Sequence, residues 1–465
     1  MTDTSAVHIP YIKRPFLLLK DIFTPLSFVE RFLLVSWLLV IALMPFDALL
    51  TSWAGSVFGH TLVVKSWKEI LIALDTLVGS LYLYRRKLFK SFYTDKIVLL
   101  IVAYTLLNLL LWAALHPAPK AAIASLLMNV RYLVFLPFGW LLLTFVERKK
   151  LARLTLYVVL GCAVIVGLFA LLEMTVLPKN FLTHFGYGFG QTVVSPYTTL
   201  NNNQAVIRLQ STLRGPNPFG AYLVIVTLLL AMLWRKRRKF FLSVLFAVSL
   251  VLLYKSYSRS AALGMAAAVA VYLWLSISNQ RVRQWIFGIG AVIIAAGVVA
   301  VLILLPHSNF LQANILHARK NQTNINSTTA HFNAVTTTVK AISHKPLGYG
   351  PGSYGPGSFY SKVPQIPENY YLDIAAETGV LGLLLFLAIN VLVARRLWFQ
   401  HRQLWPRALL AVFVGMFVIN LVLEGWSDDP TALLWWGLAG LWTAPVFVAS
   451  PNKKTRRSLN TSNRR

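Results

Sequence analysis

Apolar segments of nearly membrane-spanning length constrain this chain more than any other feature. A helix of roughly 20 apolar residues crosses the hydrocarbon core of a bilayer. Only 13% of the 465 residues are charged, against about 25% in an average soluble domain. The sequence therefore predicts an all-α, polytopic transmembrane helical bundle of about 12 spans. The predicted spans are residues 31–50, 66–84, 97–115, 122–145, 154–176, 216–234, 240–254, 259–277, 285–305, 371–393, 408–424 and 431–449.

The basic residues predict how these spans are oriented. The net charge is +29, and most Lys and Arg residues lie in clusters at the termini and in every second connection. The clusters lie within residues 13–31, 85–96, 148–153, 235–239, 281–283, 395–407 and 453–465. Basic connections stay on the cytoplasmic side of a membrane, so both termini are predicted to be cytoplasmic. A charge distributed in this way indicates contact with membrane lipids and argues against nucleic acid.

The same pattern divides the chain into regions. Because the other outward connections are short, we expect function to concentrate in two long outward loops. The regions are a cytoplasmic N-terminal segment (1–30), nine spans (31–305) that include the outward loop 177–215, a large outward loop (306–370), three spans (371–449) and a basic cytoplasmic tail (450–465).

The large outward loop contains two recognisable parts. Residues 328–343 are expected to form a short amphipathic helix lying on the membrane. The Gly- and Pro-rich segment 346–357 is typical of consecutive tight turns. Close approach of the glycine backbone to a ligand is the alternative interpretation.

Three arginines stand at outward helix entries, against the general charge bias. Arg208 and Arg214 precede the span that begins at Pro216, and Arg259 opens the span 259–277. Such side chains can extend toward lipid headgroups. The alternative is recognition of an anion, because guanidinium groups match phosphate oxygens. An anionic, membrane-bound substrate such as a diphosphate-linked lipid would fit this arrangement.

Polar residues also precede the span 371–393. Glu368 can accept a proton or orient a hydroxyl, and Asn369 can cap the helix or bind substrate. Asp373 and Glu377 stand four residues apart on one face, where stabilisation of the helix N-terminus is the simpler interpretation. In the preceding loop, His331 and His344 are candidate general bases, although each is also explained as a solvated loop residue.

Arg131 falls in the middle of the fourth predicted span and therefore requires a buried partner. Asp75 is the expected partner. The sequence contains no HExxH motif, Cys/His cluster or Walker-type loop. We therefore expect no metal and no other cofactor.

At these positions the chain resembles the superfamily of O-antigen ligases and O-antigen polymerases. The signature of that family is His, then Asn, Ser or Gln, nine residues, Gly, two residues and a small residue. Here Asn369, Gly379 and Gly382 match, and Glu368 stands where the family has His. Further landmarks are similar, namely Arg208 with Pro216-Asn217, Ser258-Arg259 and Pro346-Leu347-Gly348.

The resemblance implies metal-independent, inverting glycosyl transfer at the outer side of the bacterial cytoplasmic membrane. The donor would be an undecaprenyl-diphosphate-linked glycan, and the acceptor a glycan, lipid or protein. Arg208 and Arg259 would bind the diphosphate, with Arg214 as an added candidate. The family histidine activates the acceptor hydroxyl. In this chain Glu368 could take that role as a carboxylate base, or His331 or His344 could replace it.

Several functional alternatives follow from the same residues. A ligase and a polymerase of lipid-linked repeat units share this pattern. A polysaccharide or lipid transporter is a different class, and predicts charged or helix-breaking residues at mid-membrane in paired halves. Because the polar residues concentrate outside, transfer is the favoured hypothesis. The change from His to Glu also leaves room for a catalytically inactive, glycan-binding relative.

Overall fold

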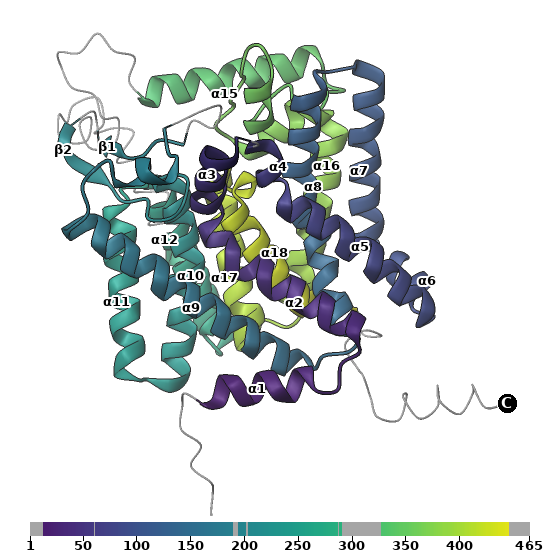
Figure 1. Ribbon diagram of the computed structural model, residues 1–465, viewed down its shortest axis with the longest axis vertical. Coiled ribbons are helices and arrows are strands. Elements are labelled where there is room, and N and C mark those ends of the chain that lie inside the picture. Colours follow the sequence, from purple (N-terminus) through teal and green to yellow (C-terminus); the bar gives the residue numbers. More distant parts are fainter. Residues whose placement is uncertain are drawn as a thin grey trace, which may run out of the picture.

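A computed structural model describes residues 13–59, 61–188, 194–200, 203–286, 288–290 and 327–445. Within these ranges the protein is a helical bundle with one small sheet (Figure 1). The elements are α1 Lys13–Phe23, α2 Phe28–Leu43, η1 Met44–Phe46, α3 Asp47–Phe58, α4 Thr61–Lys65, α5 Trp67–Arg85, α6 Phe89–Tyr93, α7 Lys96–Leu115, α8 Pro119–Leu142, α9 Arg148–Thr175, η2 Phe181–Phe185, β1 Thr198–Leu200, β2 Asn203–Arg208, α10 Pro216–Arg237, α11 Phe240–Lys255, α12 Arg259–Ser276, α15 Ser327–His344, η4 Pro356–Tyr360, α16 Tyr370–Trp398, α17 Leu404–Asn420, η5 Gly425–Ser427 and α18 Asp429–Thr443.

The protein is a membrane protein by the length and composition of its helices. Seven helical segments within the described ranges are long and apolar enough to cross a bilayer. They are Phe28–Phe58, Lys96–Leu115, Pro119–Leu142, Arg148–Thr175, Pro216–Lys236, Arg259–Ser276 and Tyr370–Trp398. Two further apolar helices, Phe240–Lys255 and Leu404–Asn420, are shorter.

The predicted count of about 12 spans is therefore not confirmed. Helix α5 carries Lys68, Glu69 and Asp75 within its length, and α18 has only 15 residues. The predicted span 408–424 ends as a helix at Asn420. The predicted span 285–305 falls mostly outside the described residues, as do most of the N-terminal segment before Lys13, loop residues 306–326 and the C-terminal tail.

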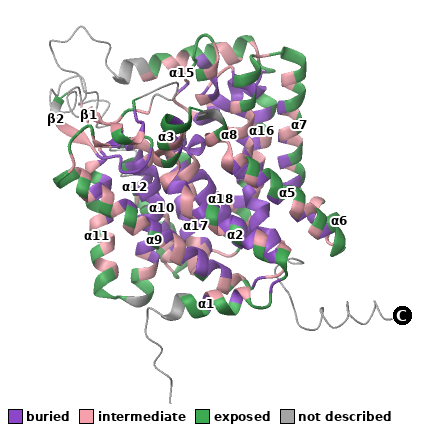
Figure 2. Cartoon of the chain, in the orientation of Figure 1, coloured by how far each residue is buried: buried purple, intermediate pink, exposed green. Residues whose placement is uncertain are grey.

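Helix α18 forms the centre of the bundle. Every residue from Thr431 to Thr443 is buried, and Figure 2 shows the exposed residues on peripheral helices such as α7 and α11. Small residues let backbones approach closely in such bundles. A Cβ added at Gly440 of α18 would lie 2.3 Å from the Leu136 carbonyl oxygen of α8, and one at Gly264 of α12 would lie 2.8 Å from the Gly415 oxygen of α17. These contacts fix α8 against α18 and α12 against α17.

Arg131 lies inside the bundle, but its predicted partner was wrong. Its Nη1 donates to Glu69 Oε1 at 2.6 Å, and its Nη2 pairs with Asp429 Oδ1. Asp75 instead accepts a hydrogen bond from Ser36 at 2.8 Å. The partners come from the first turns of α5 and α18, where a carboxylate is also favoured by the helix dipole.

The loop of residues 177–215 contains a hairpin that the sequence analysis did not predict. Strands β1 and β2 pair antiparallel, with Thr198 opposite Arg208. The hairpin lies at the same end of the bundle as α15 (Figure 1). It ends at Arg208, so it carries one of the candidate arginines to this end of the molecule.

Candidate functional site

Helix α15 and the turns after it pack beside the first part of α16. The predicted amphipathic helix at 328–343 is present as α15. The following glycines, Gly348, Gly350, Gly352 and Gly355, all have positive φ, so the interpretation of segment 346–357 as tight turns is confirmed. A Cβ on Gly352 would lie 2.3 Å from the Ala121 carbonyl carbon of α8. The backbone of these turns is therefore in contact with the helices. A ligand cannot approach it closely at those positions.

The backbone conformation at Gly379 explains why the signature motif has a glycine there. Gly379 interrupts α16 with φ 72° and ψ −179°, a region that is essentially restricted to glycine. At this kink Val380 N donates to Pro346 O at 2.9 Å, and Tyr349 N donates to Ala376 O at 2.8 Å. The kink thus receives the 346–350 turn and fixes where α15 is connected to α16.

Replacing Gly379 with alanine is expected to destabilise the protein by about 1–3 kcal/mol from backbone strain alone. An added Cβ would also lie 2.6 Å from the Leu347 carbonyl carbon, so the docked turn would shift as well. Thermal unfolding of the detergent-solubilised protein measures this change. Gly161→Ala is the matched control, because a Cβ there meets no atom within 4 Å. Equal stability of the two variants would contradict the assigned role of the kink.

Glu377 is a structural residue rather than a surface carboxylate at a helix end. It is buried and accepts hydrogen bonds from Gly352 N at 2.6 Å, from Asn129 Nδ2 at 3.1 Å and from Ser125 Oγ. These contacts tie the glycine-rich turns and α8 to α16. Asp373 is also buried, on the same face of the helix.

His331 and Glu368 form a hydrogen-bonded pair. His331 Nδ1 contacts Glu368 Oε2, joining the start of α15 to the residue before the cap of α16. The side chains are 29% and 43% exposed, so both are accessible. Glu368 has φ 53°, a left-handed backbone conformation that residues other than glycine seldom adopt. Such strained residues concentrate at functional sites.

Asn369 caps α16, as one of the two sequence interpretations predicted. Its Oδ1 accepts hydrogen bonds from Tyr371 N and Leu372 N, each at 3.0 Å. Its Nδ2 donates to Leu421 O at 2.8 Å, just after the end of α17. The side chain therefore holds Glu368 at a fixed place relative to α17.

Arg208 lies within electrostatic range of Arg259. Arg208 Nε donates to Ser256 O at 3.1 Å, and its Nη2 donates to Asn217 Oδ1 at 2.7 Å. Burial, and after it the positive charge of Arg259, lower the pKa of Arg208. Arg259 begins α12 and is exposed. Two neighbouring guanidinium groups are suited to bind an anion with more than one charge.

Arg214 has a different environment from the other two arginines. It forms an ion pair with Asp428, the residue that precedes α18. Its backbone follows a buried stretch in which Ser211 N donates to Glu173 Oε2 at 2.7 Å and Thr212 Oγ1 donates to Pro45 O at 2.8 Å. Its charge is thus already compensated by the protein.

Glu424 is a residue of this region that the sequence analysis missed. Its Oε1 is buried and has no hydrogen-bond partner among the described residues. Burial raises the pKa of its carboxyl to about 8, opposed by Arg214 and reinforced by Glu377, Asp428 and Glu368. The sequence feature that could have indicated Glu424 is its position directly after an apolar run and before the acidic pair Asp428-Asp429.

The C-terminal end of α17 connects the helix that begins at Arg259 with the His331–Glu368 pair. A Cβ on Gly264, in the second turn of α12, would lie 2.6 Å from the Ile419 side chain. Two residues further along, Leu421 accepts the hydrogen bond from Asn369. Arg259 and Glu368 are therefore both positioned by the same end of one helix.

His344 is separate from this arrangement. Its Nδ1 lies 2.6 Å from Lys340 O within α15, and its side chain is exposed. Among the described residues, no group of three or more His, Cys, Asp and Glu side chains has a geometry that could hold a metal ion.

Comparison with known protein families gives a match over part of the chain. Residues 244–387 match the family model described as O-Antigen ligase. The matched range begins within α11 and ends within α16, and so includes Arg259, His331, Glu368 and the kink at Gly379. No curated protein matches the chain.

Proposed function

We propose that this member of the O-antigen ligase superfamily is a membrane glycosyltransferase that transfers an undecaprenyl-diphosphate-linked glycan to an acceptor. Transfer would occur at the outer side of the bacterial cytoplasmic membrane, by inversion and without a metal. The acceptor would be a glycan, lipid or protein. The single observation that carries this proposal is the accessible His331–Glu368 pair, held by the same end of α17 that packs on the arginine-bearing entry of α12.

The proposed acid–base chemistry follows from the hydrogen bond between the two side chains. A carboxylate that accepts from Nδ1–H fixes the imidazole tautomer with its lone pair on Nε2. His331 Nε2 would then take the proton from the acceptor hydroxyl, and Glu368 would stabilise the resulting imidazolium. In this assignment the general base is a histidine, as in the family, but it comes from α15 and not from the signature position.

The leaving group requires positive charge on the opposite side of the reacting carbon. The acceptor oxygen would form a bond to the anomeric carbon as the bond to the diphosphate breaks and its electron pair stays on the diphosphate. Arg208 and Arg259 would hold that charge. Arg214, already paired with Asp428, would contribute to positioning. Asn369 would hold Glu368 in place through the cap of α16.

The proposed orientation in the membrane rests on the basic clusters. Both termini would be cytoplasmic under the positive-inside rule. The loops 177–215 and 306–370 would then face outward, with α15 lying over the outer surface. The regions predicted from sequence remain part of this proposal.

The test is glycan transfer in a purified system. Wild-type protein would be mixed with undecaprenyl-diphosphate oligosaccharide and a panel of acceptors, and the products would be separated by mass. Products on a different acceptor support a ligase, whereas lengthened lipid-linked repeats support a polymerase. Movement of lipid across vesicles without transfer would support a transporter and contradict the proposal.

Arg259→Gln is expected to lower kcat about 10²–10³-fold, the scale of losing one charge-stabilising donor at a transition state. The physical reason is weaker stabilisation of the departing diphosphate. Arg281→Gln is the matched control, because Arg281 is an exposed cation beyond the other end of α12. An Arg259→Gln enzyme with the turnover of the Arg281→Gln enzyme would remove Arg259 from the proposed role.

A further inference from the structure

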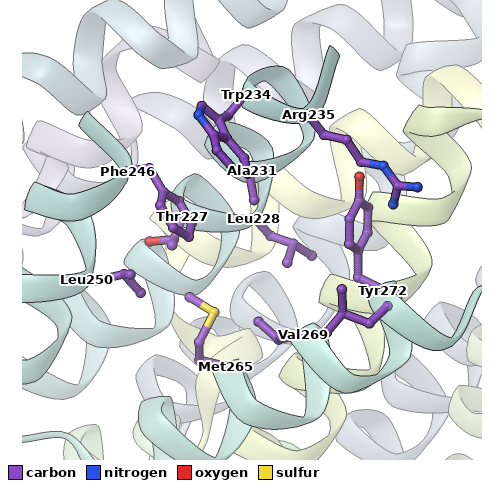
Figure 3. A pocket seen from close by; sticks show the side chains of 11 residues that line it. Thr227, Leu228, Ala231, Trp234, Arg235, Phe246, Leu250, Met265, Val269 and Tyr272 are labelled. Carbon is purple, nitrogen blue, oxygen red and sulfur yellow. The ribbon is translucent and has the colours of Figure 1, made fainter. Parts of the chain in front are cut away.

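A cavity of about 220 Å³ lies between α10, α11 and α12, away from the proposed transfer site. Figure 3 shows side chains from these helices around it, including Thr227, Phe246 and Met265. Tyr272 lines the cavity 13 residues beyond Arg259 on α12. At about 1.5 Å rise per residue this is roughly 20 Å from the arginine entry. The Tyr272 end of the cavity therefore lies toward the opposite end of α12 from Arg259.

One side of the cavity is apolar and open to the surroundings of the bundle. Leu250, Val269 and Leu273 line it and are 40%, 38% and 56% exposed. Since these helices are apolar along their length, the surroundings at this depth are lipid. A hydrocarbon chain can therefore enter the cavity from the side and bury its surface against Leu228 and Met265.

A basic residue stands at the other end of the cavity. Arg235 lines it and begins the run Arg235-Lys236-Arg237-Arg238-Lys239. Trp234, which is 43% exposed, lies beside it. Tryptophan and arginine in this arrangement are typical of the boundary between hydrocarbon and headgroups. Anionic lipids are attracted to such basic segments.

Two of the residues that line the cavity carry a buried hydroxyl group. Tyr272 is 5% exposed and Thr227 is 1% exposed, and neither hydroxyl has a hydrogen-bond partner among the described residues. Unpaired buried polar groups are costly and call for an explanation. In Figure 3 the Tyr272 hydroxyl points to the side of the cavity where Arg235 lies. The Tyr272 hydroxyl is therefore the group placed to bond to the oxygens of an amphiphile at Arg235.

We propose that this cavity binds an anionic phospholipid of the leaflet that faces the basic run, with an acyl chain among the apolar residues and the phosphate at Arg235 and Tyr272. The donor's isoprenoid chain is the competing occupant. The cationic end favours the phospholipid, because the donor's charged group would be held at the opposite end by Arg208 and Arg259. The choice of phospholipid over the donor chain rests on the proposed function, whereas the lipid site itself does not.

The test measures lipid binding to the detergent-purified full-length protein by mass spectrometry of the intact complex. Phosphatidylglycerol, phosphatidylcholine and undecaprenyl phosphate are the probes. We expect wild type to retain phosphatidylglycerol at least ten-fold more tightly than phosphatidylcholine. Arg235→Gln should lose this preference, and Ala231→Trp should lower binding by filling the cavity. Lys236→Gln is the matched control, because Lys236 is exposed and does not line the cavity.

Tyr272→Phe provides a variant that conserves the shape of the site and should lower phosphatidylglycerol binding a few-fold. Equal binding by wild type, Arg235→Gln and Tyr272→Phe would overturn the proposal. Tighter retention of undecaprenyl phosphate than of phosphatidylglycerol, with loss in Ala231→Trp, would instead assign the cavity to the donor chain.

Discussion

Replacing His331 with alanine is expected to lower the rate of glycan transfer about 10²–10⁴-fold, the usual contribution of a positioned general base. The acceptor hydroxyl would have to lose its proton to water instead of to Nε2. Donor binding should be unchanged, since His331 contacts Glu368 rather than either arginine. The measurement is single-turnover transfer at saturating donor and acceptor, together with donor affinity determined separately.

The control for this prediction lies on the same helix. His344→Ala should keep wild-type turnover, because His344 is exposed and its Nδ1 contacts Lys340 O within α15. Glu368→Gln should lower turnover less than His331→Ala, and the double variant should be no slower than His331→Ala alone. Residues that act as one unit are non-additive in this way. Wild-type turnover in His331→Ala, with a large loss in Glu368→Gln, would make Glu368 the base and contradict our assignment.

Several helix boundaries could be predicted closely from the sequence. The predicted span 97–115 is observed as Lys96–Leu115, and 259–277 as Arg259–Ser276. Both helices begin after side chains that accept a backbone N–H, Asp95 and Ser258, so a local cap and a long apolar run together set these ends. The number of membrane crossings was less predictable, because charged side chains in α5 are buried against partners that a hydropathy pattern does not reveal.

The candidate site was only partly predictable. Glu368 and the kink at Gly379 belong to one contiguous motif, so spacing alone indicated them. His331 lies 37 residues earlier, and nothing local distinguishes it from the other histidines of the loop. Its pairing with Glu368 depends on where the 346–350 turn docks on α16, which is a long-range contact. The same limit explains Glu424, whose neighbours come from separate parts of the chain.

Arg131 shows why the buried charge pairing could not be read from the pattern. Asp75 was the expected partner because it also falls mid-span. The observed partners, Glu69 and Asp429, lie at the first turns of α5 and α18. In a sequence, carboxylates at such positions look like surface residues at helix ends. The bundle places the first turns of α5 and α18 beside the middle of α8. The position of a residue along its own helix therefore did not predict how deeply it is buried in the bundle.

Replacing Arg131 with methionine is expected to destabilise the protein by about 3–5 kcal/mol, because it leaves buried carboxylates without their cation. Arg131 is 7% exposed, and its partners Glu69 and Asp429 are 9% and 13% exposed. Lys68 contacts the same two carboxylates, but one ammonium cannot reproduce the forked hydrogen bonds of a guanidinium. The free energy of unfolding in detergent, from denaturant titration, measures the change.

Lys120→Met on the same helix is the matched control, because Lys120 is exposed and a surface substitution usually stays within about 0.5 kcal/mol. Arg131→Lys should fall between the control and Arg131→Met, since it keeps the charge without the fork. The substitution should also disturb the proposed site, because Asp429 is adjacent to Asp428, the ion-pair partner of Arg214. Arg131→Met should therefore weaken transfer as well as stability. A destabilisation no larger than that of Lys120→Met would mean that the carboxylates do not need this cation, and that α5, α8 and α18 are held together by their apolar contacts alone.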